Sequence, residues 1–124
     1  MAQKVLITDD NEKNRKLLRV ILSKKGYDVI EADNGEKAVE ITKTDKPDLI
    51  LMDYRMPLMD GIEATKIIKS KSSPPIPVFI VTSSAMPGDS ERIRNESGCD
   101  MLFTKPIDYT ALLTEIQHIT GEQS

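Results

Sequence analysis

The sequence predicts a single α/β domain in which five parallel strands alternate with five helices. Short apolar runs that are typical of strands alternate along the chain with amphipathic patterns that are typical of helices, and this order indicates a parallel sheet with helices on both faces. Two of the runs, LILM and VFIV, are apolar without interruption, as expected for strands that are buried on both faces. The 124 residues are enough for one core without disulfides or metals as staples, so we expect one domain over residues 1–124.

The strands are predicted from apolar runs of strand length, and the helices from apolar residues at helical spacing. In chain order, the predicted strands cover residues 4–8, 27–32, 48–53, 78–81 and 100–104. The predicted helices cover residues 12–25, 35–45, 61–70, 89–97 and a last segment that starts near Asp108. The proline-containing stretch 69–77 is interpreted as a surface loop before the fourth strand.

Capping and stop residues support the helix boundaries. Asn34 and Asp60 stand where their side chains can accept hydrogen bonds from first-turn amides, and Gly26 is placed to end the first helix. The expected inner face of the first helix carries Leu17, Leu18, Ile21 and Leu22. The last helix carries Leu112, Leu113, Ile116 and Ile119 at helical spacing.

Composition and charge exclude several classes of protein. The net charge of −3 provides no basic surface for nucleic acid. The apolar runs are too short to span a bilayer, and the N-terminus lacks the basic and apolar regions of a secretion signal. The single cysteine, Cys99, cannot form an internal disulfide. We therefore expect a cytoplasmic protein with no direct nucleic-acid binding and no membrane insertion.

Three aspartates stand at the ends of two predicted strands. Asp9 and Asp10 follow the first strand, and Asp53 ends the third. The carboxyl ends of parallel strands meet at one edge of the sheet, where ligand sites of such folds form. Three carboxylates at close range repel one another by on the order of a few kcal/mol per pair, and their oxygens are suitable ligands for Mg²⁺. The alternative, for each aspartate taken singly, is that it caps a helix or a turn.

Two further polar residues, Thr82 and Lys105, also follow apolar runs. Asp53 can act as a nucleophile that forms an aspartyl phosphate. Lys105 and the metal would then neutralise charge on the phosphoryl oxygens, and the Thr82 hydroxyl would donate to a third oxygen. On the sequence alone Lys105 is equally well interpreted as a solvated surface lysine. Whether its peptide bond to Pro106 is cis is left open.

Four segments give the chain a resemblance to a known family. They are ITDDN at 7–11, PDLILMDYRMPLMDG at 47–61, VTSSAM at 81–86 and TKPI at 104–107. With these motifs the chain resembles the receiver domains of response regulators in two-component signalling, over about residues 4–119. The resemblance implies a flavodoxin-like fold with sheet order 2-1-3-4-5. It also implies a receiver over residues 1–124 with no output domain.

The resemblance implies roles for the acidic residues. Asp53 would accept a phosphoryl group from a phosphohistidine on a partner. Asp9 and Asp10 would hold Mg²⁺ together with Asp53 and the backbone carbonyl of Arg55. The chain would then be a phosphoprotein and not an enzyme, since it would catalyse only its own phosphorylation and slow dephosphorylation.

The resemblance further implies a switch and its partners. Thr82 and Lys105 would move toward the new phosphoryl oxygens and shift the surface made by the fourth helix, the fifth strand and the fifth helix. Leu102 stands where many members carry an aromatic residue that follows this shift, which is a departure from the family's pattern. The implied partners are a sensor histidine kinase or a histidine phosphotransfer protein, and a downstream protein target. Phosphorylation-dependent dimerisation is left open.

Three other classes of protein fit the sequence less well. A small aspartate-nucleophile phosphatase, the main alternative, places D-x-D at one strand end, whereas Asp9 and Asp10 are adjacent and Asp53 lies on another strand. A flavin carrier would need a first loop richer in glycine or hydroxyl residues. A DNA-binding regulator would need an additional module after about residue 120, where only GEQS follows.

Overall fold

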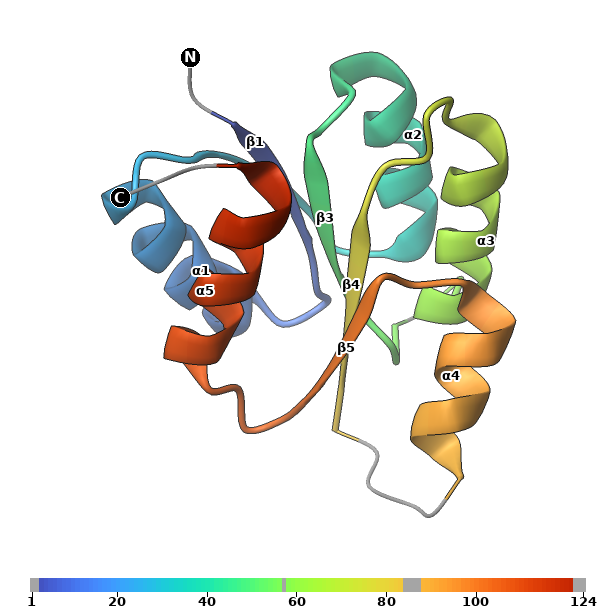
Figure 1. Ribbon diagram of the computed structural model, residues 1–124. Coiled ribbons are helices and arrows are strands. Elements are labelled where there is room, and N and C mark those ends of the chain that lie inside the picture. The colour runs from blue at the N-terminus through green and yellow to red at the C-terminus, as the bar shows by residue number, and fades with distance from the viewer. Residues whose placement is uncertain (1–2, 57, 84–87, 122–124) are drawn as a thin grey trace.

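The computed structural model describes residues 3–56, 58–83 and 88–121, and in this part of the chain strands alternate with helices (Figure 1). The strands are β1 (Lys4–Thr8), β2 (Asp28–Ala32), β3 (Leu49–Asp53), β4 (Val78–Thr82) and β5 (Met101–Thr104). The helices are α1 (Glu12–Lys24), α2 (Gly35–Asp45), α3 (Gly61–Lys71), α4 (Asp89–Ser97) and α5 (Tyr109–Thr120). None of these described helices is both long and apolar enough to cross a membrane.

The strands form one parallel sheet in the order β2-β1-β3-β4-β5, which confirms the predicted topology. The register pairs Thr8 of β1 with Met52 of β3, and Asp53 of β3 with Val81 of β4. The carboxyl ends of these three strands therefore lie side by side at one edge of the sheet, at the lower end in Figure 1. This edge is where the polar residues singled out in the sequence were expected to meet.

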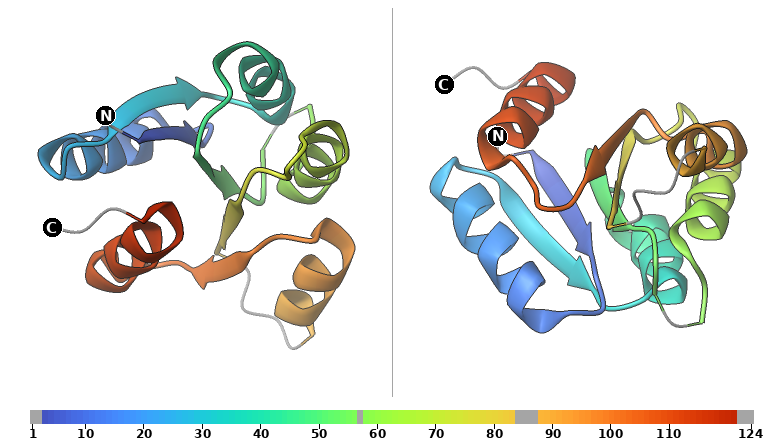
Figure 2. Two further views of the ribbon diagram at one scale, coloured as in Figure 1. Left: turned by 45° about the horizontal axis from the view of Figure 1, so that its top comes forward. Right: turned by 90° about the horizontal axis from the view of Figure 1, so that it is seen from below.

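Helices enclose the sheet on both faces, α1 and α5 on one and α2, α3 and α4 on the other (Figure 2). Side chains of a strand point to alternate faces, so Val5 and Ile7 of β1 pack in the core under α1 and α5, whereas Leu6 packs in the other core. Every residue of β3 and β4 is buried, as their uninterrupted apolar runs predicted.

The predicted helix caps are confirmed. The Asn34 side chain accepts a hydrogen bond from the Lys37 amide at 2.9 Å, and the Asp60 side chain accepts one from the Glu63 amide at 2.9 Å. Asp108 caps α5 in the same way. Each such cap typically stabilises a helix by about 1 kcal/mol. Local side-chain chemistry therefore sets where these helices begin.

One prediction about α1 is wrong. Leu18 and Leu22 are buried, but Leu17 exposes 45% of its surface. The four apolar residues expected on the inner face form two adjacent rows on the helix, at i and i+4, and only the row of Leu18 and Leu22 faces the core. Ile119, near the end of α5, is likewise exposed.

Candidate functional site

Three carboxylates gather at the carboxyl edge of the sheet. Asp9 directly follows β1 and Asp53 ends β3, which is its neighbour. One carboxylate oxygen from each of Asp9, Asp10 and Asp53 lies within 4.8 Å of the other two. Asp9 and Asp53 are buried, whereas Asp10 is exposed. The arrangement offers a set of hard oxygen donors around one point, open to solvent on the side of Asp10.

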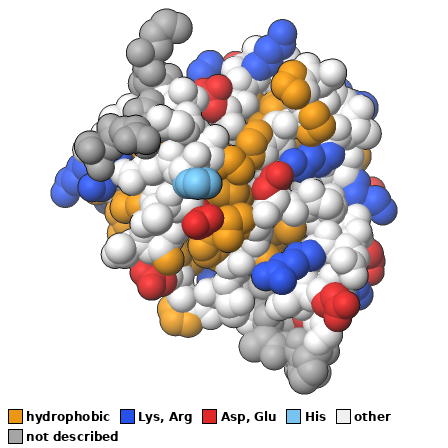
Figure 3. Space-filling model, viewed as in Figure 1, with side chains coloured by type: hydrophobic (Ala, Val, Ile, Leu, Met, Phe, Trp, Pro, Cys, Tyr) orange, Lys and Arg blue, Asp and Glu red, His pale blue; other side chains and the backbone are white. Residues whose placement is uncertain are grey.

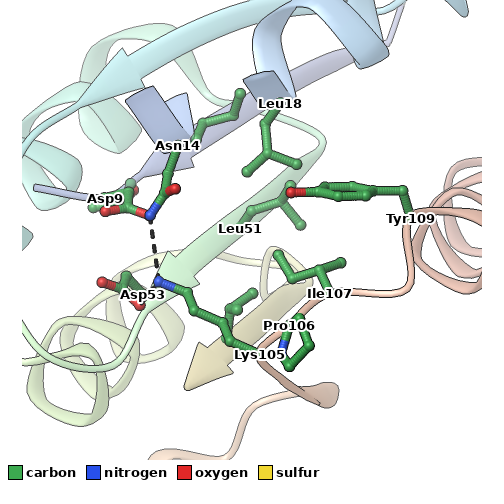
Figure 4. A pocket seen from close by; sticks show the side chains of 12 residues that line it. Asp9, Asn14, Leu18, Leu51, Asp53, Lys105, Pro106, Ile107 and Tyr109 are labelled. Carbon is green, nitrogen blue, oxygen red and sulfur yellow. Dashed lines mark ion pairs between the residues drawn. The ribbon is translucent and has the colours of Figure 1, made fainter. Parts of the chain in front are cut away.

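Lys105 completes this cluster from the loop after β5. Its backbone N–H donates to the carbonyl of Thr82 at 2.8 Å, which ties the loop to the end of β4. Its ammonium lies 3.3 Å from Asp53 Oδ1 and 3.7 Å from Asp9 Oδ2, and Figure 4 shows it reaching toward both. The peptide bond between Lys105 and Pro106 is cis. Lys105 is thus engaged with two carboxylates and is not a freely solvated surface lysine.

The charge around Asp53 is unbalanced. Burial raises the pKa of the Asp53 carboxyl from its ordinary value of 3.8 to about 6, and the negative charges of Asp9 and Asp10 add to the rise, while Lys105 opposes it. One ammonium therefore does not compensate three carboxylates, two of them buried. A divalent cation would relieve this repulsion, and the donor set of carboxylate oxygens suits Mg²⁺.

The remaining predicted site residues lie around the cluster. Thr82 ends β4, one residue beyond the Val81 that pairs with Asp53, and is buried. Arg55 is in the loop after β3, with its guanidinium 5.8 Å from the centroid of the Tyr54 ring. The role of its carbonyl as a metal ligand stays a prediction. Of the motif at 81–86, residues 84–86 lie outside the described residues.

A glycine closes the loop that follows Asp53. The Gly61 amide donates to the carbonyl of Tyr54 at 2.8 Å. A Cβ atom at Gly61 would lie 2.5 Å from the Asp53 carbonyl oxygen, closer than real contacts allow. The start of α3 can therefore pack directly against the backbone of Asp53 only because residue 61 has no side chain.

Sequence reasoning missed two contacts that hold the site in place. Arg15 of α1 donates to the main-chain carbonyl of Asp9 at 2.7 Å, and Arg92 of α4 donates to the Tyr54 hydroxyl at 2.7 Å. Arg15 thus contacts a site aspartate directly, and Arg92 contacts the residue that follows Asp53. The sequence carried one usable signal, an arginine in the first turns of the helix that follows the acidic pair.

A cavity of about 200 Å³ opens beside the carboxylates (Figure 4). Its polar part is lined by Asp9, Asn14, Asp53 and Lys105, and its apolar part by Leu18, Leu51, Ile107 and Tyr109, among others. The Asp53 carboxylate thus borders a cavity whose lining is partly polar and partly apolar.

Comparison with known proteins identifies the family. The family model of the response regulator receiver domain matches residues 5–117. The polar-differentiation response regulator DivK of Brucella anthropi is 40% identical over 123 residues, which cover 98% of this chain and 99% of that protein. DivK of Brucella ovis is 39% identical with the same coverage.

Solved structures agree with the sequence relatives. The receiver domain of a sensor histidine kinase from Pseudomonas aeruginosa, with a magnesium ion coordinated in its active site cleft, is 29% identical at a TM-score of 0.88 and covers 98% of this chain and 100% of that chain. The signal receiver domain of a histidine kinase from Syntrophus aciditrophicus is 29% identical at a TM-score of 0.90, covering 99% and 95%. The predicted flavodoxin-like fold is confirmed, and the chain belongs to the family of response regulator receiver domains of two-component signalling.

Proposed function

We propose that this receiver accepts a phosphoryl group onto Asp53 from a phosphohistidine of a partner protein, in a reaction that needs Mg²⁺. One observation carries the proposal. The carboxylates of Asp9, Asp10 and Asp53 lie within 4.8 Å of one another, and the Lys105 ammonium lies 3.3 Å from Asp53. A nucleophile, oxygen donors for a divalent cation and a fixed positive charge thus occupy one edge of the sheet, as phosphoryl transfer requires.

The metal would be held by carboxylate oxygens of Asp9, Asp10 and Asp53 and by the backbone carbonyl of Arg55. Burial, together with the negative charges of Asp9 and Asp10, raises the pKa of the Asp53 carboxyl, and a cation at this cluster would offset these charges. Bound there, Mg²⁺ supplies positive charge to the phosphoryl oxygens. The related receiver with magnesium in its active site cleft supports the same choice of ion.

The chain's own residues would carry the transfer. An ionised Asp53 oxygen attacks phosphorus, and the bond from phosphorus to the donor's imidazole nitrogen breaks, with its electron pair leaving on that nitrogen. Because the pKa of Asp53 is about 6, the carboxylate is mostly ionised at neutral pH. The Lys105 ammonium neutralises one phosphoryl oxygen, and the Thr82 hydroxyl donates a hydrogen bond to another.

The new phosphoryl group would act on the surface made by α4, β5 and α5. Lys105 follows β5 and bonds to the Thr82 carbonyl, so displacement of either residue is transmitted to this strand. Met101, Leu102 and Phe103 of β5 are only partly buried. Figure 3 shows hydrophobic side chains gathered between α5 and the side of the molecule that carries α3 and α4. This surface would control the binding of a downstream target, with Leu102 in place of the usual aromatic residue.

The partners follow from the family and from the relatives. Receiver domains of histidine kinases are among the similar structures, and a sensor histidine kinase or a histidine phosphotransfer protein would donate the phosphoryl group. Matches to polar-differentiation response regulators over 98% of this chain support a signalling role. The switch would work in the cytoplasm.

Incubation with a small phosphodonor and Mg²⁺, followed by intact-mass measurement, tests the proposal. We expect one phosphoryl group per chain, and none when a chelator removes the metal. Asp53→Asn keeps the size of the side chain but removes the nucleophile, so it should block the addition, and undiminished labelling of this variant would exclude Asp53 as the acceptor. Sustained turnover of a generic phosphate ester would instead favour the phosphatase alternative.

A further inference from the structure

An arginine of α1 holds the turn between β1 and α1. Arg15 Nη1 donates to the main-chain carbonyl of Asp9 at 2.7 Å, and Arg15 Nε donates to Glu31 Oε1 of β2 at 3.2 Å. The Arg15 side chain is only 16% exposed. A single guanidinium therefore bridges the acidic turn and the neighbouring strand, and neither contact has a part in the transfer described above.

Glu31 fixes the position of this guanidinium. Its second oxygen accepts a hydrogen bond from Arg19 at 2.6 Å, so the carboxylate is held by two arginines of α1. The fork of an arginine sets direction as well as charge when it uses two nitrogens at once. Arg19 binds the same carboxylate but has a side chain that is 44% exposed, and no contact between it and Asp9 is recorded among the described residues.

The contact to Asp9 matters because of where that carbonyl lies in the chain. The Asp9 amide donates to the Ala32 carbonyl at 3.1 Å, and the Asp9 carboxylate accepts from the Asn11 amide at 2.8 Å. The Asp9 carbonyl belongs to the peptide that joins Asp9 to Asp10. Its direction therefore helps to set where the exposed Asp10 side chain points, and Arg15 is the side chain that holds it.

We propose that Arg15 is a positioning residue for the metal centre, locked by Glu31, which orients the Asp9–Asp10 peptide so that both carboxylates face the same point as Asp53. The inference rests on the proposed function, because it assumes that these carboxylates bind Mg²⁺. It goes beyond that function by assigning the order of the turn to an ion pair between α1 and β2. A surface ion pair with no such role would contribute little to the stability of the fold.

Calorimetric titration of Mg²⁺ into the metal-free protein tests this role, with Arg15→Met as the variant and Arg19→Met as its matched control. Both substitutions remove an arginine that bonds to Glu31, but only the first removes a contact to Asp9. Loss of an outer-shell partner typically costs about 10–100-fold in metal affinity. We expect Arg15→Met to weaken Mg²⁺ binding about tenfold and Arg19→Met to leave it within about twofold of the parent.

Two results would overturn the proposal: Mg²⁺ affinity of Arg15→Met equal to that of the parent, or an equal loss in Arg19→Met. Arg15→Lys keeps the charge but cannot make both contacts, so we expect only partial recovery, and full recovery would also overturn a positioning role. Urea unfolding without metal separates loss of folding from loss of binding. If Arg15→Met does not fold, Glu31→Gln takes its place. We expect Glu31→Gln to bind Mg²⁺ more weakly than the parent, and unchanged Mg²⁺ binding would contradict the proposal. Absence of Mg²⁺ binding by the parent would instead overturn the proposed function itself, and the positioning role with it.

Discussion

The side chain of Asp53 experiences opposing charges that decide its protonation. Burial and the charges of Asp9 and Asp10 favour its neutral form, whereas the Lys105 ammonium at 3.3 Å favours the ionised one. Burial and the two negative charges outweigh the effect of Lys105, so the pKa of the Asp53 carboxyl rises to about 6. In the proposed reaction, a cation bound beside Asp53 would favour the ionised form of its carboxyl. Metal binding and the readiness of Asp53 to react would then be linked at this one residue.

The raised pKa of Asp53 predicts how stability depends on pH. A carboxyl whose pKa is higher in the folded state binds more protons there, so its stabilising contribution is complete below the unfolded value of 3.8 and is lost as pH rises through about 6. We compare the free energies of unfolding of Asp53→Asn and the parent with a chelator present. Relative to the parent, the value for Asp53→Asn should rise by about 1–2 kcal/mol between about pH 4 and pH 7, after allowance for solvent screening. Urea unfolding at both pH values measures this gap, and a constant gap would contradict the raised pKa.

Replacement of Lys105 should separate metal binding from the response to phosphorylation. Lys105→Met removes the ammonium that lies between Asp53 and Asp9 but leaves all three carboxylates. We expect Mg²⁺ still to bind, while phosphorylation no longer alters hydrogen exchange in β5 and α4, because the group that would draw β5 toward the phosphoryl oxygen in the proposed switch is missing. If phosphorylated Lys105→Met showed the same change in exchange as the phosphorylated parent, this role for Lys105 would be wrong.

The convergence of the candidate site residues was predictable for those residues whose positions depend only on the ends of strands. Asp9, Asp53 and Lys105 directly follow or end strands whose order and direction could be inferred, so their convergence required no knowledge of side-chain packing. The contacts of Arg15 and Arg92 were not predictable in this way. Each depends on where a long side chain on a helix lies relative to another element, and sequence periodicity gives the face of a helix but not its exact neighbours.

Among the described helices, α4 buries the fewest apolar side chains. Its buried residues are Ile93 and Ser97 only, and its first residue follows Gly88, which provides no side-chain cap. The hydrogen bond from Arg92 to the Tyr54 hydroxyl at 2.7 Å joins it to the residue next to Asp53. An element with few buried apolar contacts opens at low free-energy cost, so a single hydrogen bond has a measurable influence on it.

Removal of the Tyr54 hydroxyl should loosen α4. Tyr54→Phe keeps the ring but deletes the acceptor of the Arg92 hydrogen bond, so we expect amide exchange in α4 to accelerate severalfold. Tyr27→Phe is the matched control, because the Tyr27 hydroxyl lies 3.3 Å from Thr120 of α5 and has no recorded contact to α4 among the described residues. Equal exchange in α4 for Tyr54→Phe and the parent would refute the tether.

Element boundaries were predictable because local chemistry determines them. Asn34, Asp60 and Asp108 each cap a helix through their own side chains, and such caps can be recognised without tertiary structure. The exposure of Leu17 could not be predicted in the same way. Two rows of apolar residues on α1 fit the helical period equally well, and only the position of α1 against the sheet decides which row is buried.

In the whole molecule, the cores that stabilise the fold are separate from the sheet edge that carries the charged cluster. Two apolar cores cover the two faces of the sheet, and the charged cluster lies at the carboxyl edge where the strands end. The sheet order was predictable from the family resemblance, and the alternation of elements agreed with it. A ligand that binds at this edge only in the folded state should therefore stabilise the complete fold.

Mg²⁺ should stabilise the whole protein in a pH-dependent way. A ligand that binds only the folded state at ten times its dissociation constant adds about 1.4 kcal/mol. We expect a gain of this size in urea unfolding at about pH 7.5, and a much smaller one at about pH 5, because Asp53 with a pKa of about 6 is then mostly protonated and repels less. Asp53→Asn provides the control, since its response to Mg²⁺ should be weaker and should vary less over this range. Equal stabilisation of the parent at both pH values would contradict the assignment of Asp53 to the metal site.

Locating the phosphoryl group on the chain is the measurement that bears most directly on the central claim. Borohydride reduction of an acyl phosphate marks the modified carboxyl, and peptide mass spectrometry then finds it after treatment with a phosphodonor, with and without Mg²⁺. We predict a single reduced site at Asp53 that depends on the metal. A mark on Asp9, Asp10 or another carboxyl, or an equal mark at Asp53 without Mg²⁺, would contradict the account.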